Sequence, residues 1–248
     1  MNYRIEICAN SAASCIEAEK GGAYRVELCA GIPEGGTTPS YGEIKTAMEN
    51  TNLKMNVIIR PRGADFLYSR TELKSMLYDI EMCKSLGVDG VVFGCLTAQG
   101  DLDMAYMQQL MKASEGLSVT CHRAFDACRN PFETLEKLID LGVDRILTSG
   151  QKSTAVEGIP LLAGLIEKSN NRIIIMPGCG INESNIAKIA KETGAVELHM
   201  SLRKKIEGGM KYRNPDLFMG NPDLSEFCYD QTDAQKVRFC LGKLEQGK

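Results

Sequence analysis

Short apolar runs and helical patterns alternate along the whole chain. The runs are too short for helices, and the segments between them carry apolar residues three or four positions apart, which is typical of amphipathic helices. A sequence motif that starts at a glycine and continues into an apolar run occurs four times, and each copy indicates a helix end followed by a strand. The copies begin at Gly22, Gly87, Gly142 and Gly194. They lie roughly 50 to 65 residues apart, about twice the length of one strand-helix unit, so we assign them to every second strand.

The remaining strands fall in the gaps between these copies. We predict them at 3–8, 54–60, 117–122 and 172–176, with helices at 11–20, 40–50, 71–86, 104–114, 132–141, 155–168 and 184–192. Alternation of this kind predicts parallel strands with crossover helices. A doubly wound sheet is the alternative. The regular spacing of the four glycine-led strands favours closure into a (β/α)8 TIM barrel, which needs about 250 residues.

The end of the chain departs from this repeat. We predict that residues 1–201 form the barrel and that 202–248 form a C-terminal extension of the same domain, with a last helix near 233–245. A stretch rich in Gly, Asn and Pro through 211–215 would either fold over the barrel mouth or form an oligomer contact. We expect a homo-oligomer of unspecified symmetry.

Composition narrows the class of protein. The chain has 248 residues, a formal net charge of -3 and only 6% aromatic residues, which disfavours nucleic acid as a partner. No apolar run approaches the roughly 20 residues of a membrane span, and the first residues lack the apolar core of a signal peptide. We therefore expect a cytoplasmic protein with no membrane partner.

Ten cysteines are scattered along the predicted strands and helices. Without a secretory signal, they are expected to be reduced. The chain has no Cys-x-x-Cys pair, which disfavours a zinc knuckle or a thioredoxin-type site. Most of the thiols should be small apolar filler.

Charged residues stand inside or at the ends of the predicted strands. Glu6 and Glu27 are each bracketed by apolar residues, while Arg60, His122 and His199 follow apolar runs directly. Because burying an unpaired charge is costly, these groups should meet one another or a ligand. The strand ends of a parallel barrel converge on one face, where catalytic groups collect.

An enzyme is one interpretation of this pattern. Arg60, Arg62 and Arg123 are suited to forked recognition of a carboxylate or phosphate, which predicts a small anionic ligand. Glu6 and Glu27 on adjacent strands would push one carboxyl pKa upward and so provide an acid and a base.

The two histidines, His122 and His199, could move a proton or bind a metal ion. Asp126 would orient His122 or Arg123, or cap the helix that starts near Pro131. Isomerase or lyase chemistry fits these groups best, because the strand ends offer no lysine for a Schiff base.

A structural interpretation stands beside the enzymatic one. Glu6 and Glu27 would neutralise Arg60 and Arg123 as an ion-pair ring inside the barrel. Buried ion pairs seldom stabilise more than apolar packing does, so such a ring at one level favours function.

The turn after the seventh strand is a candidate for phosphate binding. Gly178 and Gly180 precede a helix at the place where barrels often present backbone N–H groups to a phosphate, and Ser149 from the sixth strand could assist. The eighth strand ends at His199-Met200-Ser201 and lacks the small-residue turn that usually completes such a site.

Several ordered motifs between about residues 5 and 214 resemble the CutC family of copper homeostasis proteins. They are Glu27-Leu28-Cys29, Glu34 to Ser40 (EGGTTPS), Ile59 to Gly63 (IRPRG), Asp65 to Ser69 (DFLYS), His122 to Asp126 (HRAFD), Leu147 to Gly150 (LTSG) and Met176 to Ile181 (MPGCGI). The resemblance implies a (β/α)8 barrel, a cytosolic location and a role in copper handling. The sequence departs from the family pattern at Cys121, where Phe is frequent, and at Cys179, which replaces a glycine.

Copper binding has its own chemical basis. Cu(I) is soft and prefers two or three sulfur ligands, and Cys8 and Cys29 close the first two strands, which are neighbours in a barrel. Further ligands could come from Cys121, Cys179, the histidines or nearby methionines. The alternative is that Cys8 and Cys29 are packed, inert thiols. Two hypotheses follow, a Cu(I)-binding protein and a TIM-barrel enzyme for a small anion.

Overall fold

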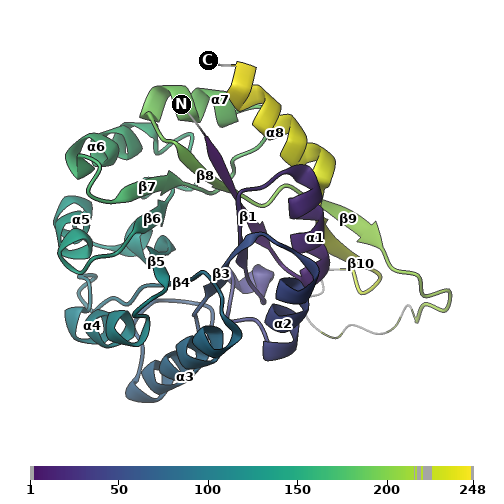
Figure 1. The fold of residues 1–248 in the computed structure, drawn as a ribbon, viewed down its shortest axis with the longest axis horizontal. Helices are drawn as coiled ribbons and strands as arrows, with labels where there is room; N and C mark the ends of the chain where they lie inside the picture. Colours follow the sequence, from purple (N-terminus) through teal and green to yellow (C-terminus); the bar gives the residue numbers. More distant parts are fainter. Residues whose placement is uncertain (1–2, 215, 217–218, 220–224, 247–248) are drawn as a thin grey trace.

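Eight parallel strands curl into a barrel in the computed structural model, which describes residues 3–214, 216, 219 and 225–246 (Figure 1). The hydrogen-bonded order is β7-β6-β5-β4-β3-β2-β1-β8, and β7 lies beside β8. The strands are β1 (Arg4–Ala9), β2 (Arg25–Leu28), β3 (Lys54–Ile58), β4 (Gly90–Phe93), β5 (Ser118–Cys121), β6 (Arg145–Thr148), β7 (Ile174–Pro177) and β8 (Glu197–Met200). The predicted barrel is confirmed.

Helices surround the strands on the outside of the barrel. They are α1 (Ala12–Gly21), α2 (Tyr41–Asn50), α3 (Arg70–Leu86), α4 (Met104–Ala113), α5 (Pro131–Asp140), α6 (Ile159–Ser169) and α7 (Ile186–Thr193), with 3-10 turns η1 (Ile32–Glu34) and η2 (Arg123–Ala127). The prediction for α6 was wrong at its start, which comes four residues later than expected. Ala155 donates its N–H to the carbonyl of Cys179, 3.0 Å away, and this bond ties the preceding turn to the β7 loop.

The four repeated glycines end helices as predicted. Gly22, Gly87, Gly142 and Gly194 have φ values of 88°, 78°, 76° and 78°. This left-handed conformation is strained for residues with a Cβ, so glycine is the residue that lets each chain segment turn into the next strand.

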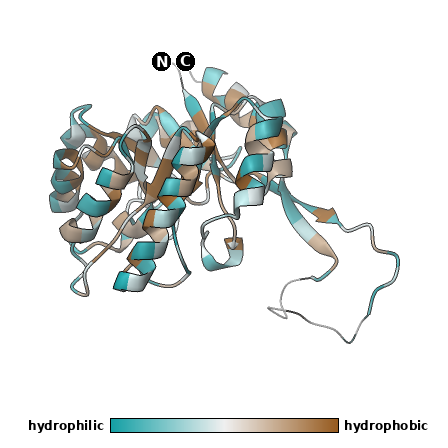
Figure 2. Ribbon diagram, turned by 60° about the horizontal axis from the view of Figure 1, so that its bottom comes forward, coloured by the Kyte–Doolittle hydropathy of each residue, from teal (hydrophilic) through white to brown (hydrophobic). Residues whose placement is uncertain are grey.

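The C-terminal extension forms a hairpin and a helix. Strands β9 (Arg203–Glu207) and β10 (Cys228–Thr232) pair antiparallel and project away from the barrel (Figure 2). The hairpin base is held where Asn10 donates to the carbonyl of Asp230 at 2.7 Å. The stretch predicted to cover the mouth or contact another subunit runs along this projection to residue 214, and its last residue, Pro215, lies outside the described residues.

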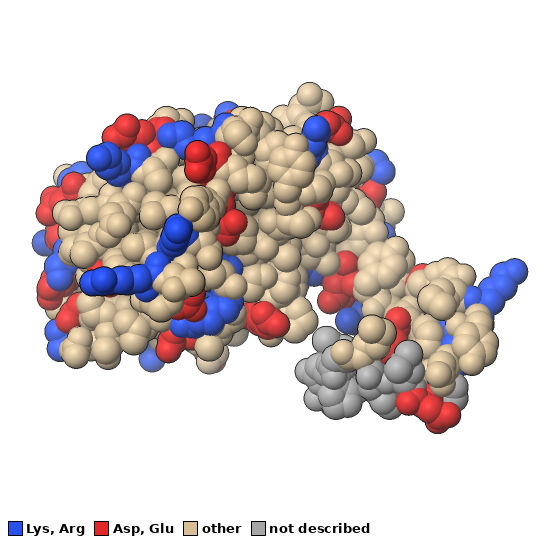
Figure 3. All heavy atoms as spheres, turned by 90° about the horizontal axis from the view of Figure 1, so that it is seen from below, with Lys and Arg blue, Asp and Glu red and all other residues tan. Residues whose placement is uncertain are grey.

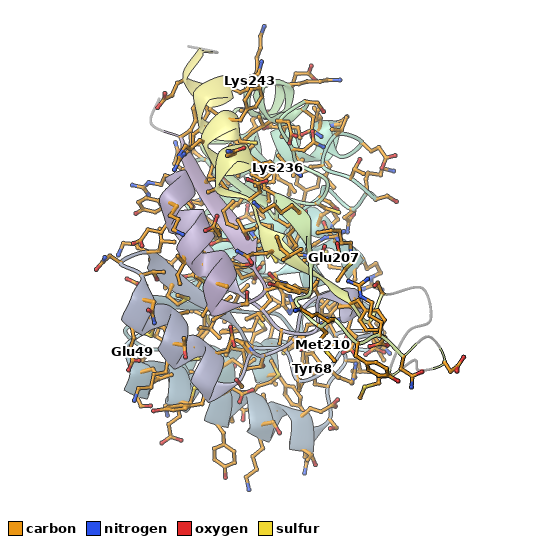
Figure 4. The ribbon with its side chains drawn as sticks, turned by 90° about the vertical axis from the view of Figure 1, so that its right-hand side faces the viewer. Glu49, Tyr68, Glu207, Met210, Lys236 and Lys243 are labelled. Carbon is orange, nitrogen blue, oxygen red and sulfur yellow. The ribbon has the colours of Figure 1, made fainter. Side chains whose placement is uncertain are left out.

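Helix α8 (Ala234–Gln246) returns from the hairpin and packs against α1 and α7 (Figure 1). Val237 lies so close to Gly21 that a Cβ on the glycine would be 2.5 Å from it. Lys236, which Figure 4 shows on α8, donates to the carbonyl of Arg203 at 2.9 Å. The helix therefore fixes the base of the hairpin to the barrel.

The hydrophobic core lies between the strands and the helices, and the inside of the barrel is largely polar. Outward residues such as Ile5, Ile7 and Val26 are fully buried in one apolar cluster with helix residues. The alternate, inward positions hold Glu6, Arg25, Glu27, Asn56, Thr120, Arg145, Glu197 and His199, all buried. Because successive residues of a strand face opposite sides, the buried charged residues on β1, β2, β6 and β8 are the inward residues of those strands.

The outer surface carries mixed charge. On the face seen in Figure 3, lysine and arginine side chains alternate with aspartate and glutamate. Among the described residues, no helix has the length and apolarity needed to cross a membrane.

Candidate functional site

A cavity of about 670 Å³ opens at the carboxyl ends of the strands. It is lined by the ends of the barrel strands, by loops that follow them and by the first residues after β8. Its polar lining residues are Cys8, Glu27, Cys29, Arg60, His122, Arg123, Asp126, Cys179, His199, Ser201 and Arg203. Most of the predicted site residues therefore meet at one face, as strand-end convergence requires.

A network of ion pairs fills the barrel below the cavity. Glu197 accepts from Arg25 at 2.8 Å and from Arg145 at 3.0 Å, and Arg25 also pairs with Glu6. All four side chains are less than a tenth exposed. Ion pairs are present inside the barrel, but the predicted pairs are wrong: among the described residues Glu6 pairs with Arg25 and His199, Glu27 lies beside His199, and neither pairs with Arg60 or Arg123.

His199 connects this network to the cavity. Its Nδ1 lies 2.8 Å from Oε1 of Glu6, and its Nε2 lies 3.6 Å from Oε2 of Glu27. Burial alone would lower the pKa of His199, but hydrogen bonds to Cys8 and Glu6 and the charge of Glu27 raise it well above 6.5. The imidazole is therefore held in its cationic form between two carboxyl groups.

The two glutamates that flank His199 titrate in opposite directions. Burial favours the neutral form of Glu6, but Arg25 and His199 outweigh it and lower the pKa to about 2. Burial raises the pKa of Glu27 to about 8, with His199 opposing the shift and the charges at Cys8 and Glu6 adding to it. Adjacent strands thus carry one fixed carboxylate and one carboxyl group that ionises near neutral pH.

A pair of thiols adjoins Glu27 and His199. The Sγ atoms of Cys8 and Cys29 are 3.8 Å apart, and with a carboxylate oxygen of Glu27 they form a group whose ligand atoms are all within 4.8 Å of one another. The bond from Cys29 lowers the pKa of Cys8 well below 9.0 against the effect of burial, with His199 and Arg203 adding to it. Donating that bond raises the pKa of Cys29. Arg203 donates to Cys8 Sγ at 3.3 Å.

Arg60 is bound to the protein backbone. Its guanidinium donates to the carbonyl oxygens of Glu34, Gly36 and Ala64 at 2.9, 2.7 and 2.8 Å. The loops that contain Glu34 and Ala64 are thereby fastened together at the cavity rim. Among the described residues, Nε of Arg60 has no hydrogen-bond partner.

Arg62 lies outside the cavity. Its Nε donates to Glu72 at 2.6 Å, and its terminal nitrogens bind Asp65 and the carbonyls of Gly63 and Leu67. These bonds occupy the guanidinium on the outer side of the loop, so the structure does not bring Arg62 to the other site residues.

The far wall of the cavity is built from β5 and β6. Arg123 donates to Asp126 at 2.8 Å and to Ser149 at 3.1 Å. Asp126 also accepts from the hydroxyl of Thr148 at 2.5 Å and from the backbone N–H of Ser149 at 3.0 Å. Of the roles considered for Asp126, the structure shows the orientation of Arg123.

In the glycine-rich turn after β7, part of the backbone is used in contacts within the protein. Gly178 donates its N–H to the carbonyl of Thr148, and a Cβ on it would be 2.5 Å from Leu147. Gly180 lines the cavity. Cys179 has a φ of 80°, a conformation that favours glycine. Cys121, the last residue of β5, is buried in the apolar cluster and does not line the cavity.

Sequence reasoning missed Arg25, Arg145, Glu197 and Arg203 as parts of the site. The first three carried a usable signal, because counting by two from Glu27 or His199 leads to inward-facing Arg25 and Glu197. Arg145 occupies the matching position in the third copy of the repeated sequence motif. Arg203 carried no such signal, since it reaches Cys8 from the hairpin base.

The family model described as the CutC family matches residues 3–204, which span the whole barrel. The chain belongs to the CutC family. The match ends at the start of the hairpin, so β10 and α8 lie beyond it.

Relatives agree with this membership over nearly the whole chain. A family protein CutC from Parabacteroides distasonis is 64% identical, with 96% of this chain and 99% of the relative covered. Another from Bacteroides fragilis is 59% identical over 96% of this chain and 95% of the relative. The crystal structure of a protein proposed to act in copper homeostasis, CutC from Streptococcus agalactiae, superposes with a TM-score of 0.77 at 36% identity, covering 80% of this chain and 98% of that one. These names state no reaction, so isomerase or lyase activity stays a prediction.

Proposed function

We propose that this CutC family chain binds Cu(I) as its cargo in copper homeostasis, through the thiolates of Cys8 and Cys29. The observation that carries the proposal is the distance of 3.8 Å between the two sulfur atoms at the rim of a cavity. The role in copper homeostasis proposed for the Streptococcus agalactiae relative supports the same process.

The geometry of the pair suits one shared ion. With a metal–thiolate bond of about 2.3 Å, two sulfurs 3.8 Å apart would subtend an angle of about 110° at the metal. Thiolates are the ligands that Cu(I) prefers over harder oxygen donors. Glu27 is the third group of the cluster, and we expect it to contribute less to affinity because its oxygen is a hard ligand.

The charges around the thiols suit a thiolate site. Two thiolates and one Cu(I) carry a net charge of -1, which burial disfavours unless a cation lies nearby. Arg203 lies 3.3 Å from Cys8 Sγ, and the cationic imidazole of His199 adjoins the same group. These two cations would stabilise the thiolate form in the absence and in the presence of the ion.

The test is a titration of the reduced, metal-free protein with Cu(I) against a strong competing chelator. Wild type should compete for one equivalent of Cu(I), and the Cys8→Ser/Cys29→Ser double variant should lose this binding. Cys228→Ser is the matched control, because Cys228 lies on β10 outside the cavity. Arg123→Gln should also leave Cu(I) affinity unchanged, since Arg123 contacts neither thiol.

Two results would overturn the proposal. Wild type that fails to compete with the chelator has no Cu(I) site of useful affinity. Binding that survives in the double variant is carried by other residues.

A further inference from the structure

The wall of the cavity opposite the thiols contains hydrogen-bond donors that have no acceptor in the described part of the chain. In the barrel order, β5 lies across from β1, and its end carries His122 and Arg123. Both residues line the cavity. The copper proposal uses neither of them, so they need an explanation of their own.

His122 lines the cavity and offers a ring hydrogen that has no acceptor among the described residues. Its Nδ1 accepts from the backbone N–H of Ala124 at 3.2 Å, so Nε2 is the nitrogen that carries the hydrogen. Nε2 is buried and has no partner among the described residues, and the residue is 3% exposed. Burial and the charge of Arg60 lower the pKa of His122 to about 3, so the ring stays neutral and keeps this tautomer. A buried donor without an acceptor costs about 1–3 kcal/mol.

Arg123 presents a positive charge beside this donor. Asp126 and Ser149 hold its Nε and one terminal nitrogen, which fixes the plane of the guanidinium. The side chain is 44% exposed and lines the cavity, and its other terminal nitrogen has no assigned acceptor in the described part of the chain. A guanidinium held in this way is preorganised for an oxyanion.

Two further residues that line the cavity also have hydrogen-bond donors without acceptors among the described residues. The Nε atoms of Arg60 and Arg203 are buried and have no acceptor within residues 3–214, 216, 219 and 225–246. Among the described residues that line the cavity, only Glu27 Oε1 is a buried acceptor without a partner. A ligand that satisfies these atoms must be rich in acceptors and negatively charged, with at most one donor group for Glu27.

The remaining lining sets the size and character of the ligand. Phe66 packs against His122 with 4.9 Å between ring centroids, and Leu147 and Ile181 add apolar surface. A volume of about 670 Å³ is within the usual range for small-molecule sites, about 300–1,000 Å³. A bare metal ion would leave most of it empty.

We propose that the β5 side of this cavity is a second binding site, which holds a small organic anion through its carboxylate or phosphate group. The oxyanion accepts from Nε2 of His122 and from the guanidinium of Arg123, and a hydroxyl group on the ligand donates to Glu27. The site is complete without copper, because none of its donors belongs to the thiol pair.

Isothermal titration of the reduced, metal-free protein with chosen probes tests this site. Glycerol 3-phosphate represents a phosphate group and malate represents carboxylates, while glycerol and sodium chloride are the uncharged and simple-ion controls. We expect saturable binding of at least one organic anion and none of the controls. Binding of only one anion identifies the head group, and either choice supports the proposal.

Variants locate the binding. Arg123→Gln and His122→Gln should each weaken it at least tenfold, and Arg129→Gln should not, because Arg129 is an exposed arginine that pairs with Asp101 outside the cavity. The Cys8→Ser/Cys29→Ser variant should bind the anion like wild type. That result would distinguish the anion site from the copper site, so each of the two proposals can be refuted without the other.

The histidine spectrum gives a readout that does not depend on whether a variant folds well. The chain contains two histidines, so nitrogen-15 NMR of the wild-type imidazoles can follow His122 directly. We expect the Nε2–H tautomer in the free protein and a saturable shift of its signals with the anion. The proposal is overturned if neither anion binds, if binding persists in both variants, or if the His122 signals do not respond.

Discussion

Glu6 and Glu27 should respond in opposite directions to the same substitution. Both are buried glutamates on neighbouring strands, and both adjoin His199. Glu6 has its pKa lowered from 4.5 to about 2, whereas that of Glu27 is raised to about 8. Replacing each carboxyl with the isosteric amide removes its titration and leaves the packing volume almost unchanged.

The effect of Glu27 on the free energy of unfolding follows from the pH at which its carboxyl group ionises. Its pKa is about 4.5 in the unfolded chain and about 8 in the folded one, so between these pH values the unfolded state loses its proton first. Each tenfold difference in proton affinity is worth about 1.4 kcal/mol. The wild-type carboxyl therefore lowers the free energy of unfolding by about 1 kcal/mol at pH 5, about 3 at pH 7 and about 4 at pH 8.

Glu6 has the opposite effect on the free energy of unfolding. A folded-state pKa of about 2 means that its carboxylate contributes stability that is fully present above pH 4.5 and lost as the pH falls toward 2. Between pH 5 and 8 this contribution is constant at about 3 kcal/mol. Glu6→Gln should remove it and leave Arg25 and His199 without their shared anion.

Urea unfolding of the reduced, metal-free variants at pH 5, 7 and 8 measures both effects. Glu6→Gln should lower the free energy of unfolding by a similar amount at each pH. Glu27→Gln should raise it, and the gain should grow with pH. A loss of stability in Glu27→Gln that matches Glu6→Gln, or a gain that does not change with pH, would refute the assignment of the two carboxyl groups.

Three other substitutions test local features of the fold, each by urea unfolding at neutral pH. Arg60→Met should lower the free energy of unfolding by about 3 kcal/mol, because the buried carbonyl of Gly36 and the partly buried contacts to Glu34 and Ala64 lose a charged donor; an unchanged or higher free energy of unfolding would instead show that Arg60 serves a ligand. Cys179→Gly should raise stability by up to about 1 kcal/mol by relieving the left-handed φ of 80°, and a loss would contradict this. Gly158→Ala should cost about 3 kcal/mol, since its Cβ would lie 1.8 Å from the carbonyl oxygen of Ser149. Gly242→Ala, its control in open space on α8, should gain about 1 kcal/mol, and equal effects of the two changes would contradict the packing at Gly158.

Much of the fold could be predicted because it depends on local signals. Period-two strands, helical spacing and four glycine stops determine where elements begin and end, and their number determines closure into a barrel. The start of α6 could not be predicted, because the apolar spacing continues through Ala155 while its N–H is bonded to the β7 loop.

The site was predictable in its location but not in its pairings. Strand-end convergence brought His122, His199, Glu27 and the two N-terminal cysteines to one cavity. The partner of each charge depends on the stagger of strands across the barrel, which the sequence does not encode locally. Arg60 shows the same limit, since its partners are carbonyl oxygens of loops whose path is a tertiary property.

The separation between a polar barrel interior and an apolar outer layer has a consequence for redesign. The residues that hold strands to helices are the outward ones, such as Ile5, Ile7 and Val26, whereas the chemistry resides on the inward ones. A combinatorial library restricted to the inward positions that line the cavity, with Glu6 and Arg60 kept unchanged, would alter the ligand that the cavity accepts and leave the strand-helix interface intact. Within this scaffold, selectivity and foldability can be varied on different sets of residues.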